Sequence, residues 1–264
     1  FRDPLVTNPD VDQDSWQSSA RKLIETLVVR TADRVAWLDM IQLPEDYFRE
    51  TYPSVPNERW LQLPPVGYEE ALFEGVRGAV FDEFTITYAG SFYQGWIEPY
   101  SFLDGVERYV SKFGADIDVK FYGDWNDEYQ AYVEDLGLGE VITYEGLLPH
   151  KEIVPVLKGS DLLLYVGGSE RRNRRSISSK MWDYIGARSP VLAIADSEFR
   201  VHDFVDEYRI GISVTPENPD AIASAIHSVK TGEYEYEPEN DVFSDYTRSY
   251  NAQVLTEAMS EVAD

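Results

Sequence analysis

The chain of 264 residues has room for one large or two modest domains, and its 12 Phe, 18 Tyr and 6 Trp supply a hydrophobic core, which excludes a disordered protein. The formal net charge of −25, from 48 acidic and 23 basic residues, disfavours nucleic acid as a partner and is typical of a salt-adapted (halophilic) protein surface. No cysteine is present, which excludes disulfides and thiolate metal sites, and the three histidines are far apart without ligand spacing, which disfavours a histidine-built metal site. No apolar run approaches the roughly 18 residues of a membrane span.

Residues 1–83 differ in pattern from the rest, and we interpret them as a remnant of an N-terminal domain with a linker. A long amphipathic helix is expected from about residue 14 to 32, with Leu23 and Leu27 at helical spacing. The chain begins at Phe1 and opens like the interior of a domain, which suggests that residues are missing upstream. The other elements expected here are a strand over 34–38, a helix over 44–52, a strand over 61–68 that ends in a Pro-Pro-x-Gly turn, and a connection over 69–82.

From residue 84 to about 240, short apolar runs alternate with helical patterns. Strands are expected at 84–89, 119–122, 141–144, 161–166, 191–194 and 211–214. Helices are expected at 100–113, 127–136, 150–157, 178–187, 199–207 and 219–229. This alternation predicts an α/β fold, a Rossmann-like parallel sheet with helices on both faces. The last part of the chain, residues 241–264, is expected to contain a terminal helix from Tyr246 to Ala263.

Four of the expected strands end in a glycine turn, at Gly90, Gly123, Gly146 and Gly167. Because parallel strands end at one edge of their sheet, these turns are expected side by side, where open α/β sheets bind ligands. The sequence contains neither a G-x-G-x-x-G nor a Walker pattern, so the glycines alone do not identify a nucleotide site.

Lys180 lies in the first turn of the helix that Ser178 and Ser179 are expected to open and cap. A cation there faces the positive end of the helix dipole, which is locally unfavourable. A local rule broken at a helix N-terminus indicates that an anion is expected, so we predict a phosphate site. The simpler alternatives are a solvated lysine and an ion pair with Asp183, three residues further on.

An arginine cluster precedes this helix in an otherwise acidic chain. Arginine forks match phosphate geometry, so the cluster is a candidate site for a donor diphosphate or an anionic acceptor. A solvated loop is the simpler alternative. The cluster consists of Arg171, Arg172, Arg174 and Arg175.

In their order and spacing, these segments resemble the family 4 glycosyltransferases of the GT-B fold over essentially the whole chain. The resemblance implies that residues 84–240 form the C-terminal nucleotide-sugar-binding domain and that residues 1–83 belong to the acceptor-binding domain. The segments that carry it are Ile86-Thr87-Tyr88-Ala89-Gly90-Ser91-Phe92-Tyr93, Phe121-Tyr122-Gly123, Leu136-Gly137-Leu138, Val141-Ile142-Thr143-Tyr144-Glu145-Gly146, Pro149-His150-Lys151-Glu152-Ile153, Ser160-Asp161-Leu162-Leu163-Leu164 and residues 180–194.

Enzymes of this family move a sugar from a nucleotide-sugar donor to an acceptor with retained configuration and no obligatory metal. The resemblance implies diphosphate contacts at Gly90, Ser91 and the serine–lysine helix start, backbone contacts to the base at 146–148, and ribose contacts at Asp183. The donor-binding residues implied are Gly90, Ser91, Gly123, Gly146, Leu147, Leu148, Ser178, Ser179, Lys180 and Asp183. No catalytic residue is assigned.

The chain departs from the family pattern in two places. Arg175 and Asp183 stand where two glutamates are usual, and residues 91–96 contain neither Arg nor Lys where the family often has both. Asp116-Ile117-Asp118 resembles the metal-binding Asp-x-Asp motif of the other glycosyltransferase fold, but it precedes a strand, so we interpret it as a solvated turn. His150 begins an expected helix near the loop for the base, and we expect no ligand role for it.

The resemblance implies a nucleotide-sugar donor as substrate, a glycan, lipid or protein acceptor, and no cofactor or metal. It points to a cytoplasmic protein and leaves peripheral association with the inner membrane face open. The chain is expected to bind nucleotide but to transfer little sugar. Two alternatives remain: a nucleotide-sugar 2-epimerase of the same architecture, and a non-catalytic module that binds a nucleotide or a glycan.

Overall fold

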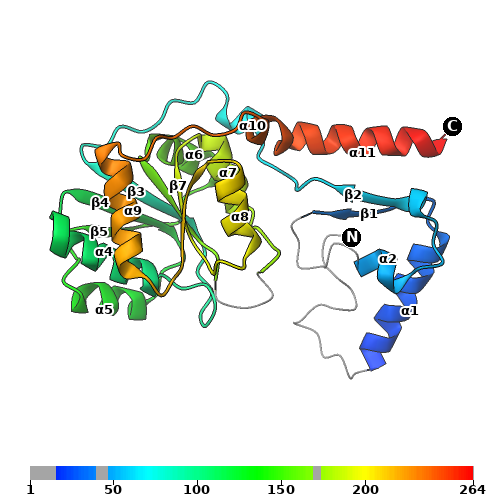
Figure 1. Cartoon of the computed structure of the whole chain (residues 1–264), viewed down its shortest axis with the longest axis horizontal. Coiled ribbons are helices and arrows are strands. Elements are labelled where there is room, and N and C mark those ends of the chain that lie inside the picture. The colour runs from blue at the N-terminus through cyan, green and yellow to red at the C-terminus, as the bar shows by residue number, and fades with distance from the viewer. Residues whose placement is uncertain (1–15, 40–46, 169–173, 264) are drawn as a thin grey trace.

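The computed structural model describes residues 16–39, 47–168 and 174–263, which form two parallel sheets and the helices around them (Figure 1). The small sheet pairs β1 with β2. Its aromatic core includes Trp37, Phe48 and Trp60, all buried. The elements of this part are α1 (Trp16–Thr31), β1 (Val35–Leu38), α2 (Tyr47–Thr51) and β2 (Trp60–Leu63).

The helix expected near residues 14–32 is present as α1, but Leu23 and Leu27 do not face the core. Their side chains are 71% and 62% exposed, whereas Glu25 and Val29 are buried. The carboxylate of Glu25 accepts hydrogen bonds from the hydroxyls of Tyr47 (3.0 Å) and Tyr52 (2.9 Å), which offset its desolvation. The spacing of the leucines therefore did not identify the buried face of α1. That face contains Glu25, which is buried through its hydrogen bonds to two tyrosines.

The large sheet confirms the predicted α/β fold. All six of its strands are parallel, in the order β5-β4-β3-β6-β7-β8. The strands are β3 (Phe84–Gly90), β4 (Ile117–Gly123), β5 (Ile142–Gly146), β6 (Leu162–Val166), β7 (Val191–Ile194) and β8 (Gly211–Val214). The helices between and after them are α4 (Tyr100–Phe113), α5 (Asp127–Asp135), α6 (His150–Gly159), α7 (Lys180–Ala187), α8 (Arg200–Glu207) and α9 (Pro219–Thr231).

Helices cover both faces of this sheet, as the apolar strands predict (Figure 1). On one face Leu162, Leu164 and Val166 of β6 pack in the core that contains α4, α5 and α9. On the other face Leu163 and Tyr165 pack in the core that contains α6, α7 and α8. Alternate residues of a strand point to opposite faces, so continuous apolar character is required for burial on both sides.

The strand order has a consequence for ligand binding. The chain adds β4 and β5 on one side of β3 and then begins again with β6 on the other side. The helices that follow β3 and β6 therefore cover opposite faces, with α4 in one core and α7 in the other. A crevice at the carboxyl ends of two such strands is the usual ligand site of open α/β sheets.

The last segment returns toward the small sheet. Helix α11 (Arg248–Ala263) contacts β2 (Figure 1). Two short helices that the sequence did not predict, α3 (Glu70–Phe73) and α10 (Asp241–Asp245), both contact α7. The backbones of Tyr68 and Thr247 pair, and Arg248 forms a 2.6 Å ion pair with Glu69. Within the described ranges, none of the helices has the length and apolarity to cross a membrane.

Candidate functional site

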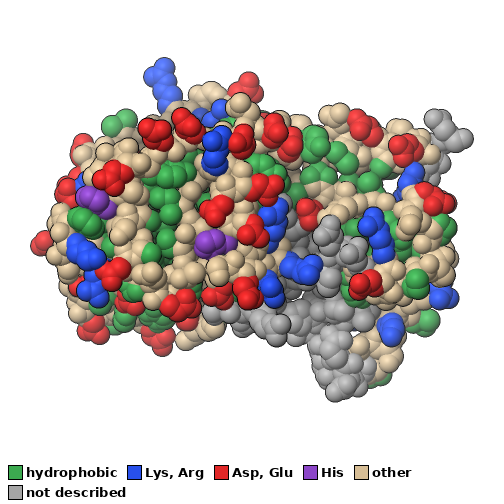
Figure 2. All heavy atoms as spheres, viewed as in Figure 1, with side chains coloured by type: hydrophobic (Ala, Val, Ile, Leu, Met, Phe, Trp, Pro, Cys, Tyr) green, Lys and Arg blue, Asp and Glu red, His purple; other side chains and the backbone are tan. Residues whose placement is uncertain are grey.

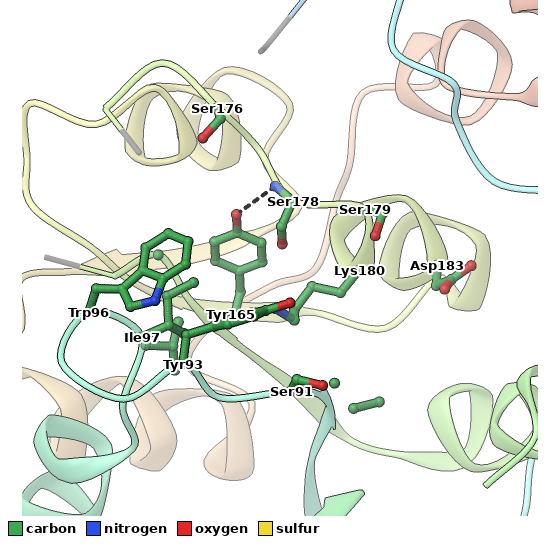
Figure 3. A pocket seen from close by; sticks show the side chains of 14 residues that line it. Ser91, Tyr93, Trp96, Ile97, Tyr165, Ser176, Ser178, Ser179, Lys180 and Asp183 are labelled. Carbon is green, nitrogen blue, oxygen red and sulfur yellow. Dashed lines mark hydrogen bonds between the residues drawn. The ribbon is translucent and has the colours of Figure 1, made fainter. Parts of the chain in front are cut away.

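A cavity of about 510 Å³ opens at the carboxyl ends of β3 and β6, the place that the strand order indicates (Figure 3). The segment after β3 forms one wall, the end of β6 forms the floor, and the segment that enters α7 forms the opposite wall. The described residues that line it are Ala89, Gly90, Ser91, Tyr93, Trp96, Ile97, Tyr165, Val166, Gly167, Ser176, Ser178, Ser179, Lys180 and Asp183.

Two of the predicted glycines bring the strand ends close together. Gly90 and Gly123 are paired in the sheet, and a Cβ atom at Gly123 would lie 2.1 Å from the carbonyl oxygen of Gly90. A Cβ atom at Gly90, whose φ is +147°, would lie 2.9 Å from Cε of Lys180. Gly90 therefore leaves space for the lysine, whereas Gly123 lies outside the lining and acts through the strand pairing.

Tyrosine hydroxyls fix the cavity walls to one another. The hydroxyl of Tyr184 donates to the carbonyl of Leu164 (2.9 Å) and accepts from the amide of Ala89 (3.2 Å), which ties α7 to both central strands. The hydroxyl of Tyr88 donates to the carbonyl of Ser91 (2.9 Å). Burial raises the pKa of Tyr88 and of Tyr184, so both phenols stay neutral.

Lys180 carries its ammonium group into the cavity. Its Nζ lies 5.3 Å from the ring centre of Tyr88 and 5.7 Å from that of Tyr165, within cation–π range. Burial lowers the pKa of Lys180 to about 8. No carboxylate in the described part of the chain forms an ion pair with it, so the alternative pair with Asp183 is not formed. The ammonium group is thus desolvated, and none of the described residues supplies its counterion.

The serines beside Lys180 do not cap the helix, contrary to our expectation. Helix α7 begins at Lys180, and Ser179 already has helical dihedral angles (φ −59°, ψ −22°), so its hydroxyl forms no capping hydrogen bond. The amide of Ser178 donates to the hydroxyl of Tyr165 (2.9 Å), while its own Oγ is buried without a partner among the described residues. The hydroxyl of Ser178 and the ammonium group of Lys180 thus lie in the cavity wall at the N-terminus of α7, and the described residues supply no anion to them.

Asp183 marks the other end of the cavity, and its partner is a residue to which we assigned no ligand role. Nε2 of His150 lies 3.0 Å from Oδ2 of Asp183. Burial raises the pKa of Asp183, and the charge and hydrogen bond of His150 oppose that shift. The two residues are 33 positions apart, so no local spacing pointed to the pair.

The loop predicted to hold the base lies outside the cavity lining. Gly146 has a φ of +79°, and the side chain of Leu147 is 80% exposed, while Leu148 is partly buried. These three positions lie two to four residues before His150, which contacts Asp183. The loop therefore runs up to the Asp183 end of the cavity.

The structure describes two of the four clustered arginines; Arg171 and Arg172 lie outside the described residues. Arg174 forms an ion pair with Glu198 (Nη2 to Oε2, 3.4 Å), and Arg175 is exposed. The described arginines are thus outside the cavity lining, and Arg174 has a carboxylate partner already.

Within the described ranges, no three His, Asp or Glu side chains come together in a way that could hold a metal ion. Asp116 pairs with Lys230 and Asp118 pairs with Lys120, so the Asp-x-Asp segment is ion-paired rather than simply solvated. It lies at the amino end of β4, at the opposite edge of the sheet from the cavity.

No protein-family model and no curated protein sequence matches this chain. Solved structures of glycosyltransferases do match it. The pneumococcal O-GlcNAc transferase GtfA, solved with UDP and GlcNAc, has 11% identity and a TM-score of 0.63, covering 86% of this chain and 45% of its own. Sucrose-phosphate synthase from Thermosynechococcus elongatus has 14% identity and a TM-score of 0.60, over 94% and 64% of the two chains.

HepE from Anabaena, solved with UDP-glucose, has 13% identity and a TM-score of 0.63, covering 92% of this chain and 68% of its own. The chain thus spans about half to two thirds of the length of these proteins. At such low identity the likeness establishes the fold: the six-stranded sheet with its helices is that of one half of a GT-B protein.

Proposed function

We propose that the cavity binds a nucleotide-sugar donor and that this chain is the donor-binding part of a glycosyltransferase that retains the configuration of the transferred sugar. The observation that carries the proposal is the ammonium group of Lys180, which lies within cation–π range of two tyrosine rings and has no carboxylate partner among the described residues. A buried charge is costly unless it is paired, and a bound diphosphate would supply the missing counterion.

The groups around Lys180 favour a phosphate over a simple carboxylate ligand. The unpartnered Oγ of Ser178 and the start of α7 offer further donors around one point, which suits an anion with many oxygens. The position also agrees with the topology, because the cavity lies where β3 and β6 diverge. The solved relatives GtfA and HepE were crystallised with UDP and UDP-glucose, respectively, which supports the same class of ligand.

Asp183 would bind the ribose hydroxyls of the donor. Its side chain is one methylene shorter than the glutamate usual at this position, so the contact is either direct or bridged by water. His150 holds one carboxylate oxygen at 3.0 Å and leaves the other available to the ligand. His150 is therefore a positioning residue for Asp183.

In sugar transfer, negative charge develops on the diphosphate as the glycosidic bond breaks. Lys180 and the donors at the start of α7 would stabilise that charge from fixed positions in a water-poor site. No described residue is assigned as a catalytic acid or base. Because the chain spans 45% of the GtfA chain, we expect donor binding rather than robust turnover from the chain alone.

The test is a calorimetric titration of UDP, GDP and ADP into the protein at high salt. We expect one of them to bind and the substitution Lys180→Met, which keeps the apolar stem, to weaken that binding about tenfold or more. Lys22→Met, on the exposed surface of α1, is the matched control and should leave the affinity unchanged. Absence of binding by all three nucleotides would refute the proposal.

A further inference from the structure

The cavity wall opposite Lys180 is aromatic rather than basic. Tyr93 and Trp96 come from the segment after β3, and their ring centres lie 5.1 Å apart with the planes tilted by 49°. Ile97 extends this apolar surface, and the side chain of Tyr93 is 49% exposed. We call residues 93–97 the aromatic hairpin. It contains no Arg or Lys, so it offers no cation to a phosphate group.

The aromatic hairpin is held in a fixed shape. The backbones of Tyr93 and Ile97 exchange two hydrogen bonds of 2.9 Å, and Gly95 at the tip has a φ of +86°. Directly before the hairpin, the ring of Phe92 stacks on that of Tyr88 with centres 4.2 Å apart and planes 7° apart. The hairpin therefore presents its rings to the cavity without a large ordering cost on binding.

Figure 3 shows an order along the cavity: the aromatic hairpin lies at one end, Lys180 and Ser178 in the middle, and Asp183 at the other end. A nucleotide sugar has a matching order in its covalent structure, with ribose, diphosphate and sugar in sequence. If the diphosphate lies at Lys180 and the ribose at Asp183, the sugar extends toward the aromatic hairpin.

Building on the proposed function, we propose that Tyr93 and Trp96 form the subsite for the transferred sugar and that this sugar is a pyranose that lies on their rings. The C–H face of a pyranose ring is apolar and slightly positive, and it complements the negative face of an aromatic ring. Pockets of this kind bind a ligand through apolar and aromatic surface, with few polar groups to orient it. The opposite orientation, with the nucleobase on the aromatic hairpin, is the competing outcome.

The experiment compares two probes on each variant: the nucleoside diphosphate that binds best among UDP, GDP and ADP, and its glucose conjugate. In Trp96→Ala and in Tyr93→Ala, we expect the affinity for the glucose conjugate to fall about tenfold, while the affinity for the diphosphate changes less than about twofold. Trp96→Phe, which keeps an aromatic face, should retain most of the affinity for the conjugate.

Phe113→Ala is the matched control, because this partly exposed ring stacks on His227 at the end of α4 and does not line the cavity. Tyr93→Ala guards against a folding defect, since Tyr93 is more exposed than Trp96, and thermal unfolding of each variant checks the fold. Equal losses for both probes would place the base on the hairpin, and no loss for either would remove the hairpin from the site; both results overturn the proposal. If the unaltered protein binds no diphosphate, the proposed function fails first, and the subsite fails with it.

Discussion

At the scale of single residues, Lys180 combines two unfavourable features: a first-turn position in α7 and a desolvated ammonium group. Each lowers the stability of the unliganded protein, and neither is relieved by a carboxylate among the described residues. Residues that break local rules in this way are expected at binding sites, where the ligand supplies the missing interaction.

If the cavity binds a nucleotide as proposed, this environment predicts how the affinity depends on pH. Burial lowers the pKa of Lys180 to about 8 in the unliganded protein, and only the charged form attracts a diphosphate. The affinity is therefore expected to be constant from pH 7 to about pH 8 and to fall as the pH rises further, by up to about tenfold per pH unit. Calorimetric titrations between pH 7 and pH 9.5 measure the profile, and Lys180→Met should remove the decline. A flat profile in the unaltered protein would contradict this role for Lys180.

Asp183 can be tested through the hydroxyl that it is proposed to bind. The nucleoside diphosphate is expected to bind more tightly than its 2′-deoxy analogue, and Asp183→Ala should reduce that difference by about fivefold to tenfold because one charge-assisted hydrogen bond is lost. His150→Ala should act in the same direction but more weakly, since it releases the carboxylate without removing it. If Asp183→Ala weakens both nucleotides equally, its contact is with the phosphates or the base instead.

The sequence could indicate those parts of the candidate site in which one residue is unfavourable within its own helix. It could not indicate the parts that depend on contacts between residues far apart in the chain. Lys180 breaks a helix rule that can be read within one turn. The His150–Asp183 pair, by contrast, depends on the chain returning to the same sheet edge. The cavity position of Trp96 depends likewise on the hairpin closed by Tyr93 and Ile97. Such contacts need tertiary structure to be seen.

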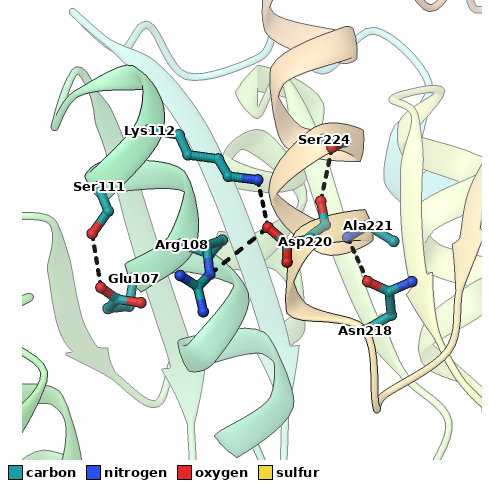
Figure 4. A network of polar contacts seen from close by, with 8 residues as sticks. All are labelled: Glu107, Arg108, Ser111, Lys112, Asn218, Asp220, Ala221 and Ser224. Carbon is teal, nitrogen blue, oxygen red and sulfur yellow. Dashed lines mark hydrogen bonds and ion pairs between the residues drawn. The ribbon is translucent and has the colours of Figure 1, made fainter.

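At the scale of elements, α4 and α9 pack closely over one face of the sheet. Asp220 of α9 interacts with two basic residues of α4 (Figure 4). Its carboxylate accepts a hydrogen bond from Nζ of Lys112, and its Oδ1 lies 3.8 Å from Nε of Arg108. The hydrogen bond from Lys112 holds the pKa of Asp220 below its usual value. Any stability from this pair is thus present above the pKa of an unfolded aspartate and lost as the pH falls through the lower folded value. Because Asp220 is exposed, we expect the buried contacts to hold the two helices together far more strongly.

The buried contact at Gly105 decides how closely the two helices approach. A Cβ atom there would lie 2.2 Å from Cγ2 of Ile222 on α9. Gly105→Ala gains about 1 kcal/mol of helix propensity, but so close an overlap is expected at the upper end of the usual overpacking cost, about 2–3 kcal/mol, so we expect net destabilisation of about 1–2 kcal/mol. Urea unfolding measures it. Ile222→Ala removes Cγ2 but keeps Cβ, which would lie 2.6 Å from the added Cβ atom, so in that background the same substitution should cost less without becoming neutral. Destabilisation of equal size in both backgrounds would show that the overlap with Cγ2 is not the cause.

Most strands of the large sheet and the helices around it could be predicted, because each is a short apolar run or a helical pattern bounded by turn residues. The helix expected over 100–113, for example, has the same bounds as α4. The short helices α3 and α10 were not expected, since four or five residues carry too little periodicity. The order of the strands in the sheet could also not be predicted from the sequence. It is set by which neighbours β3 pairs with, and those pairs involve residues up to 76 positions apart.

At the scale of the whole molecule, the most extreme property is the formal net charge of −25. Figure 2 shows acidic side chains scattered over the viewed face, without one acidic block that would suit a basic partner. The described ion pairs involve a minority of the 48 acidic residues, and the net charge is −25. Self-repulsion of the folded chain is therefore expected to lower its stability in dilute buffer.

Salt screens both the net repulsion and the attractive ion pairs. Screening the repulsion raises the stability of the folded protein, and screening the ion pairs lowers it. Exposed pairs such as Arg174–Glu198 contribute about 0–1 kcal/mol each, so screening them costs little. Net repulsion acts over the whole surface and is screened as the Debye length falls from about 10 Å at 0.1 M to about 3 Å at 1 M salt. We therefore expect the melting temperature to rise steeply with KCl and to level off near roughly molar concentration.

Calorimetric melting in a KCl series tests this, and chloride is preferable to sulfate because sulfate also strengthens hydrophobic burial. The exposed acidic segment that contains Glu233, Glu235 and Glu237 offers a matched variant. Replacing these three by lysine should raise the melting temperature in dilute buffer and flatten the salt series, because the repulsion is reduced at its source. Replacement by glutamine should give about half that effect, since each substitution changes the charge by half as much. Equal melting temperatures in dilute buffer and in concentrated KCl would show that the acidic surface does not limit stability.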